Sequence, residues 1–187
     1  MPIVFPTPGA PLPTGEGDME LIFSETLTAD QNSFDTGTLP TGFKSLLIYA
    51  RCRGDGTNNA SAMSLFFNGD LNTNNYQTSR LIHAGGNLSN DSYDVTLVGG
   101  AVQGFSSQPR YGTTAIHIID HESTTGFKSW VSNHQTISRP SGFNYYYAGL
   151  YSGVWENSDA ITSIKYRFFD PQFDLVAGSS IAVYGLK

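Results

Sequence analysis

The sequence predicts an all-β fold, an antiparallel β-sandwich of about ten strands that is jelly-roll-like, with an extended N-terminal arm. Three observations predict it. Short runs of alternating apolar and polar residues recur along the chain, and Gly, Asn, Asp or Pro separates most neighbouring runs. No window carries the i, i+3, i+4, i+7 apolar stripe of a helix. The gaps between runs are also too short for the crossover helices of a parallel sheet.

The first half of the chain supplies five of these runs. In residues 44–53 (KSLLIYARCR), alternation places Leu46, Ile48, Ala50 and Cys52 on one face of the expected strand. The turn-rich DTGTLPTG separates this run from the one before it. In order, the strands expected here are 20–28, 44–53, 61–68, 78–84 and 92–98.

The second half is equally rich in β-branched and aromatic residues, which favour strands. In residues 114–121, His117 and His121 fall on one face of a single expected strand. Positions i and i+4 of a strand lie about 13 Å apart, too far to share a metal ion. In order, the strands expected here are 114–121, 127–137, 143–151, 161–169 and 179–186.

Residues 1–17 are expected to form an extended arm, and residues 18–187 a single sandwich domain. The arm holds five of the nine prolines and three glycines, so it can be neither a helix nor a central strand. It is either a frayed terminus or an arm that docks on another subunit. Its apolar residues, which a pure linker would not need, are Ile3, Val4, Phe5 and Leu12.

Charge is low, and its sign excludes several classes of partner. Charged residues make up 14% of the chain, with 10 basic and 16 acidic side chains and a net charge of −6. This balance predicts no nucleic-acid partner, and no cluster of Lys or Arg favours a membrane surface. The longest apolar runs are far shorter than the roughly 20 residues of a membrane-spanning helix.

The sequence offers little for metal binding or catalysis, so we expect no cofactor and no enzymatic activity. Residues 70–74 (DLNTN) match the opening of a calcium loop, but Asn75 and Leu81 stand where that loop needs Gly and a bidentate Glu. The single Cys52 falls on an apolar strand face, and no G-x-S-x-G elbow occurs. Paired carboxylates for glycoside hydrolysis meet only in space, so the sequence does not test for them.

Aromatic residues crowd the segment 143–155. Alternation places Tyr145 and Tyr147 on one face of the strand and Tyr146 on the other. Such side chains pack in a core, anchor a protein interface or stack on sugars, and the sequence leaves these three roles open. The candidate interface or glycan-binding residues are Tyr145, Tyr146, Tyr147, Tyr151 and Trp155.

Two stretches resemble a known family. Residues 65–76 (LFFNGDLNTNNY) are similar to an FNGD…NY segment common in small structural proteins of tailed bacteriophages. Residues 161–187 (ITSIKYRFFDPQFDLVAGSSIAVYGLK) resemble the ending of those proteins, ITSI…GSxhxhYG, where h is hydrophobic. The resemblance implies a virion protein whose last strand closes an all-β domain, and it implies no catalytic residue.

The leading hypothesis is a capsid decoration (cement) protein on the exterior of the virion head. It would form a homotrimer, the oligomer expected of this class, and bind the major capsid protein, with the arm docking on that protein or on a neighbouring subunit. The alternative is a tail fibre or tail-tip module that recognises a host surface glycan. A third reading, a domain that cleaves or binds sugars, rests on analogy with other sandwich folds alone.

Overall fold

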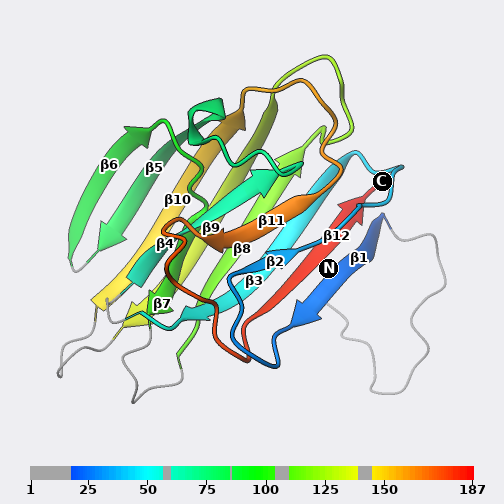
Figure 1. Cartoon of the computed structure of the whole chain (residues 1–187). Helices are drawn as coiled ribbons and strands as arrows, with labels where there is room; N and C mark the ends of the chain where they lie inside the picture. Colours follow the sequence, from blue (N-terminus) through cyan, green and yellow to red (C-terminus); the bar gives the residue numbers. More distant parts are fainter. Residues whose placement is uncertain (1–17, 57–59, 85, 104–109, 139–144) are drawn as a thin grey trace, which may run out of the picture.

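The computed structural model describes residues 18–56, 60–84, 86–103, 110–138 and 145–187. These residues form twelve strands and one short 3-10 turn, η1 (Thr73–Asn75), with no α-helix among them (Figure 1). The strands are β1 (Met19–Thr26), β2 (Ser33–Asp35), β3 (Ser45–Gly54), β4 (Ala60–Phe67), β5 (Tyr76–Ala84), β6 (Asn87–Tyr93), β7 (Gly99–Gln103), β8 (Gly112–Ile119), β9 (Lys128–Ser138), β10 (Tyr145–Trp155), β11 (Ile164–Phe168) and β12 (Ser180–Leu186). The predicted all-β class is confirmed.

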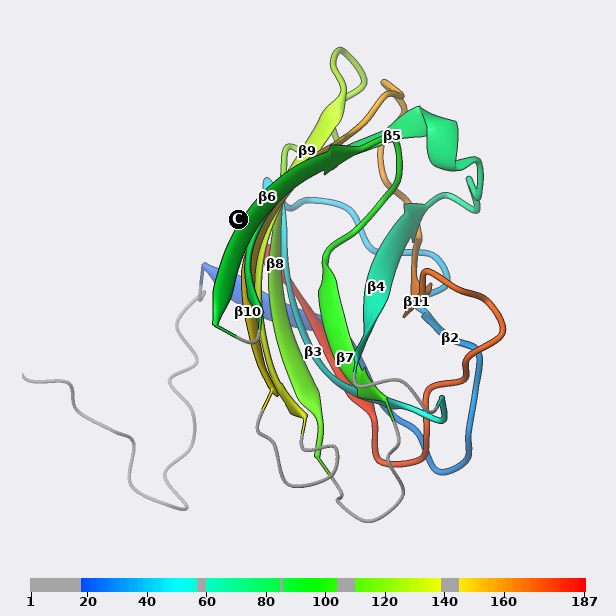
Figure 2. The same cartoon turned by 90° about the vertical axis from the view of Figure 1, so that its left-hand side faces the viewer.

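The strands form two layers. The larger is an antiparallel sheet in the order β6-β5-β10-β9-β8-β3-β12-β1. The smaller layer, β2-β11-β4-β7, covers one face of it (Figure 2). A short parallel pairing between the end of β3 and β7 joins the layers. The fold is therefore an antiparallel β-sandwich, as predicted.

The order of the strands shows how the chain builds both layers. Along the chain, β1, β3, β5, β6, β8, β9, β10 and β12 lie in the large sheet, and β2, β4, β7 and β11 lie in the small layer. The chain thus passes repeatedly from one layer to the other. The predicted arm, with Ile3, Val4, Phe5 and Leu12, lies outside the described residues.

The core lies between the layers and follows the predicted alternation. On β3, Leu46, Ile48, Ala50 and Cys52 are buried, whereas Tyr49 on the opposite face is exposed. Each large side chain that is fully buried contributes roughly 1.5–3 kcal/mol to folding. The largest buried rings cluster at the end of the sandwich near η1: Phe67, Tyr76, Trp130 and Trp155.

The expected strand at 92–98 is wrong. β6 ends at Tyr93, and residues 94–98 instead cross from the large sheet to the small layer. Thr96 is fully buried in this crossing, and its hydroxyl donates a hydrogen bond to the carbonyl oxygen of Leu65 on β4. Residues 94–98 are therefore a buried connection and not a strand. Their polar groups form hydrogen bonds with the neighbouring strand β4.

Three strands, β2, β6 and β7, have no counterpart among the predicted runs. β6 (NLSNDSY) is exposed at every residue and is held at the edge of the sheet by β5 alone. β2 is three residues long and pairs only with β11. β6 carries no apolar alternation, because pairing with β5 rather than a buried face holds it in the sheet. β2 buries Phe34 in the core, but three residues are too few to show an alternation.

Candidate functional site

The face of the large sheet that points away from the small layer, called here the outer face, is the most extensive open surface of the described structure. Strand register aligns its side chains in rows that cross all eight strands. One row is Thr26, Ser180, Arg51, Thr113, Gln135, Ala148, His83 and Leu88. The next is Ser24, Ala182, Tyr49, Ala115, Asn133, Leu150, Leu81 and Asn90.

Exposed apolar side chains gather on this face. Eight of the twelve large hydrophobic residues that are exposed in the described ranges lie there: Met19, Leu21, Tyr49, Leu81, Leu88, Ile119, Val131 and Leu150. In the two rows given above, Arg51 is the one permanently charged side chain. Exposed apolar side chains gathered on one face with so little charge favour a site of interaction.

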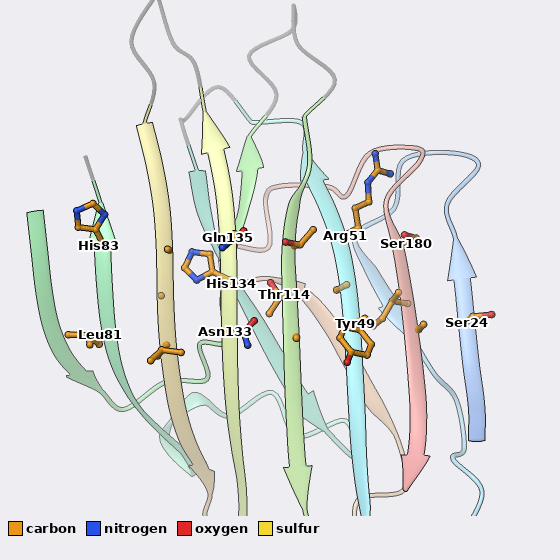
Figure 3. Close-up of a pocket in the computed structure, with 18 of the residues that line it drawn as sticks. Ser24, Tyr49, Arg51, Leu81, His83, Thr114, Asn133, His134, Gln135 and Ser180 are labelled. Atoms are coloured by element: carbon orange, nitrogen blue, oxygen red, sulfur yellow. The ribbon is translucent and has the colours of Figure 1, made fainter. Parts of the chain in front are cut away.

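Two grooves indent the outer face. The larger, called here the main groove, has a volume of about 1080 Å³ and runs along the two rows given above (Figure 3). Every strand of the large sheet contributes to its lining. A smaller groove of about 490 Å³ lies over β5, β8, β9 and β10 and includes Ile119 and Val131.

The polar groups of the main groove are mostly neutral. Tyr49, Asn133 and Gln135 present a phenol and two carboxamides (Figure 3). The guanidinium of Arg51 is held at one end of the groove, because it lies 3.7 Å from the centroid of the Tyr111 ring. It also donates a hydrogen bond of 3.2 Å to the carbonyl oxygen of Gly178.

The imidazole of His134 lies beneath the groove. Burial of the His134 imidazole lowers its pKa to about 4, and nearby Arg80 acts in the same direction, so His134 is neutral at pH 7. Gly149 lies beside this ring. A β-carbon at position 149 would lie 2.9 Å from Cε1 of His134, so a glycine is needed for the two strands to approach here.

The main groove has few charged groups in its lining. Among the described residues that line it, Glu25 is the one carboxylate. What the groove offers is apolar area, neutral hydrogen-bonding groups and a single cation. These groups suit a ligand that is extended and largely uncharged.

The aromatic residues of the segment 143–155 separate into two groups. Tyr147, Tyr151 and Trp155 share the inner face of β10, and Tyr151 and Trp155 are only 5% and 1% exposed. Their rings pack against His134 and Phe67, respectively. The structure therefore corrects the expectation that Tyr151 and Trp155 contact a partner or a glycan, because neither ring is accessible. Tyr147 is half-buried, and the side chains of Tyr145 and Tyr146 are outside the described part.

The two stretches that carry the phage resemblance contact each other. Asn68, in the turn after β4, donates a hydrogen bond of 2.7 Å from Nδ2 to the carbonyl oxygen of Ala160. Its Oδ1 accepts hydrogen bonds from the backbone N–H groups of Thr162 (2.7 Å) and Ser163 (3.2 Å) and from the Thr162 hydroxyl. The motif residues at this contact thus have a structural role.

Asp70 forms the centre of the same turn, and no metal is needed to explain it. Its Oδ2 accepts hydrogen bonds from Nδ2 of Asn75 (2.8 Å) and from Nε1 of Trp155 (2.9 Å). Its Oδ1 accepts one from the backbone N–H of Asn72. The hydroxyl of Tyr76 donates to the Asp70 carbonyl oxygen. The D-x-N-x-N segment is therefore a hydrogen-bonded turn.

The Asp70 carboxylate is expected to make stability depend on pH. Partial burial raises its pKa, but the hydrogen bonds from Asn75, Trp155 and Asn72 outweigh burial and leave the pKa below its usual range. A lowered pKa in the folded state contributes stability above the unfolded-state value of about 3.9, and this contribution is lost as the pH falls through the folded-state pKa.

We therefore expect Asp70→Asn to be less stable than wild type at pH 7 and the difference to shrink below about pH 4. Urea unfolding measured from pH 7 to pH 2 checks this. Asp91→Asn is a suitable comparison, because Asp91 lies on exposed β6 and pairs with Arg80 in an ion pair of 3.1 Å. A difference in unfolding free energy between wild type and Asp70→Asn that does not change with pH would contradict a lowered pKa for Asp70.

His117, His121 and Cys52 lie in three different settings. β8 ends at Ile119, and Asp120 adopts a positive φ of 52°, so His117 and His121 do not share one strand as expected. His117 is half-buried on the outer face, whereas His121 is buried in the following turn. Cys52 is buried in the core, and burial raises the pKa of its thiol far above the usual range.

Across the described ranges, no three His, Cys, Asp or Glu side chains are placed to hold a metal ion together. In the same ranges, no helix has the length and apolar character to cross a membrane.

Sequence reasoning missed the outer face as a site, although one signal pointed to it. In residues 44–53, large apolar side chains occur on both faces of the strand, since Leu47 and Tyr49 alternate with the core residues.

The sequence was also compared with protein families and with curated proteins. No family model matches the chain, and no curated protein matches it.

Proposed function

We propose that this chain is a structural protein of a tailed-phage virion, a decoration protein on the head that binds the major capsid protein through its outer face. The observation that carries the proposal is the concentration of exposed hydrophobic residues on that face. Binding free energy, and not chemistry, would be its contribution to the virion. A homotrimer remains the oligomer proposed for this class.

The outer face has the size that a stable protein interface needs. Eight strands at about 4.8 Å spacing and about eight residues in length give a face of roughly 34 by 26 Å. This is close to the roughly 800 Å² that each partner buries in a standard interface. Burial of exposed side chains such as Leu150 and Val131 would supply the apolar part of that area.

Two further features support a role in a virion. The FNGD…NY and ITSI…GSxhxhYG stretches resemble segments of phage structural proteins, and here they stabilise the sandwich through Asn68 and Asp70. In the described part of the chain, the fold uses neither a disulfide nor a metal cluster. A rigid sandwich of this kind suits a protein that is exposed on the outside of a particle.

The proposal is tested by locating the protein and then weakening one part of the outer face. Immunogold labelling of intact virions should place the protein on the head. The double variant Ile119→Asp/Val131→Asp puts two carboxylates into the smaller groove, and it should lower occupancy on capsids at least about tenfold, since 1.4 kcal/mol corresponds to a factor of ten.

Phe169→Asp is the matched control, because Phe169 is exposed but follows β11 in the opposite layer. It should leave occupancy unchanged. Both variants alter exposed positions, so circular dichroism should show the wild-type fold. Unchanged occupancy of the double variant would contradict a capsid contact at the smaller groove.

The second candidate is a receptor-binding module at the tail that recognises a host glycan. The main groove favours it, since Tyr49 with the carboxamides of Asn133 and Gln135 is a combination that suits a neutral sugar. Gold label at the tail would favour this candidate over the head protein. The sugar-binding residue to replace would then be Tyr49, and not the buried Trp155.

A further inference from the structure

We propose that residues 1–17 of one copy of this chain lie in the main groove of a second copy, so that copies assemble by exchanging arms. The inference adds a partner to the proposed function without depending on it, because arm exchange takes place in solution. It assigns the main groove to the arm, so that the capsid protein would meet an outer face made of the smaller groove and the docked arm.

The chemistry of the arm matches that of the groove. Residues 1–15 contain no charged side chain, and the described lining of the groove has only Glu25 and Arg51 as permanent charges. At one end, the groove presents Leu81, Leu88 and Leu150, which are 44%, 69% and 60% exposed. Apolar arm residues such as Phe5 would cover these three leucines. The apolar side chains of the arm and of the groove would then both be removed from water.

The prolines of the arm fit the polar groups of the groove. A polyproline-like segment has no internal hydrogen bonds, so its carbonyl oxygens need donors when water is excluded. The carboxamides of Asn133 and Gln135 and the hydroxyl of Tyr49 can donate from the groove. Recognition of proline-rich segments by grooves that contain aromatic residues is a recurrent mode of peptide binding.

The lengths of arm and groove agree as well. A polyproline-like segment from Ile3 to Pro13 spans about 31 Å at 3.1 Å per residue. The large sheet, with eight strands about 4.8 Å apart, is about 34 Å across. An arm lying along the rows would therefore cross the whole sheet, and the groove is lined by all of its strands.

A second copy, rather than the same chain, fits the direction in which the arm leaves. Its last residue adjoins Asp18, whose carbonyl oxygen accepts a hydrogen bond from the backbone N–H of Lys187 beside the start of β1. The main groove meets β1 at its other end, at Ser24–Thr26. A chain that entered its own groove would have to reverse direction before β1, whereas the arm of another copy need not.

The test uses full-length protein with photoreactive benzoylphenylalanine in place of Phe5. This protein, at natural isotope abundance, is mixed with ¹⁵N-labelled wild-type chains, illuminated and digested for mass spectrometry. We expect cross-links from the unlabelled arm to ¹⁵N-labelled peptides of β5, β6 or β10. Leu150→Asp in the labelled chain should lower their yield about tenfold, whereas Phe169→Asp should not.

Three results would overturn the inference. Cross-links confined to a single chain would show that the arm folds onto its own body. Cross-links to peptides outside the groove would place the arm elsewhere. Loss of all arm cross-links, together with binding of a neutral oligosaccharide that Tyr49→Ala abolishes, would assign the groove to a glycan.

A fourth result concerns the proposed function alone. Normal cross-links combined with unchanged capsid occupancy of Ile119→Asp/Val131→Asp would contradict the capsid contact and leave the arm exchange standing.

Discussion

Trp155→Ala is expected to lower the free energy of unfolding by about 4 kcal/mol, the range of large aromatic deletions in a core. Trp155 is 1% exposed, with its ring centroid 5.4 Å from that of Phe67 and 6.3 Å from that of Tyr76. Its removal leaves a cavity among these rings and takes the Nε1 hydrogen bond away from Asp70. For a domain of this size, a loss of that magnitude lowers Tm by roughly 10 °C.

Chemical unfolding in urea measures this effect, with the fluorescence of Trp130 as the remaining probe. Trp155→Phe is the matched variant, because it keeps most of the ring and loses only the hydrogen bond to Asp70. We expect it to cost about 1–2 kcal/mol. A loss below about 1 kcal/mol for Trp155→Ala would mean that the ring does not lie in the core as described.

Asn68→Ala is expected to lower the free energy of unfolding by about 2–3 kcal/mol, from lost hydrogen bonds and backbone strain. The Asn68 side chain makes four hydrogen bonds to the segment 160–163, which precedes β11. Asn68 also has a positive φ of 53°, which asparagine tolerates and alanine does not. The thermal and urea midpoints should fall together.

Two companion variants separate these causes. Asn68→Gly loses the same hydrogen bonds but has no backbone strain, so it should be about 1 kcal/mol more stable than Asn68→Ala. Asn68→Asp keeps an oxygen that accepts from Thr162 and Ser163 and loses only the donor to Ala160. It should be the least affected of the three, and equal stability of Ala and Gly at this position would argue against strain.

The sequence predicts the strands and the core well where one face of a strand is buried. Leu46, Ile48, Ala50 and Cys52 were assigned to the core by alternation alone, and all four are buried. This works because the side chains of a strand alternate between its two faces, so a buried face appears as a period of two. The same rule places Tyr145 and Tyr147 on one face of the strand but does not say which face is buried.

The sequence does not predict features that depend on strand order. Leu81 and Leu150 lie 69 positions apart in the chain, and they become neighbours because β5 pairs with β10 in that register. The main groove therefore has no local signature. β6 was missed for a related reason, since an exposed edge strand is held by its neighbour and needs no apolar pattern.

The position of β12 between β1 and β3 has a consequence for folding. Among the described strands, β1 pairs with β12 alone, and the residues between these two strands make up most of the sandwich. Closing a loop of this length costs more conformational entropy than pairing strands that follow each other in the sequence, such as β8 and β9. We therefore expect β1 to join the sheet late in refolding, after the strands with near neighbours have paired.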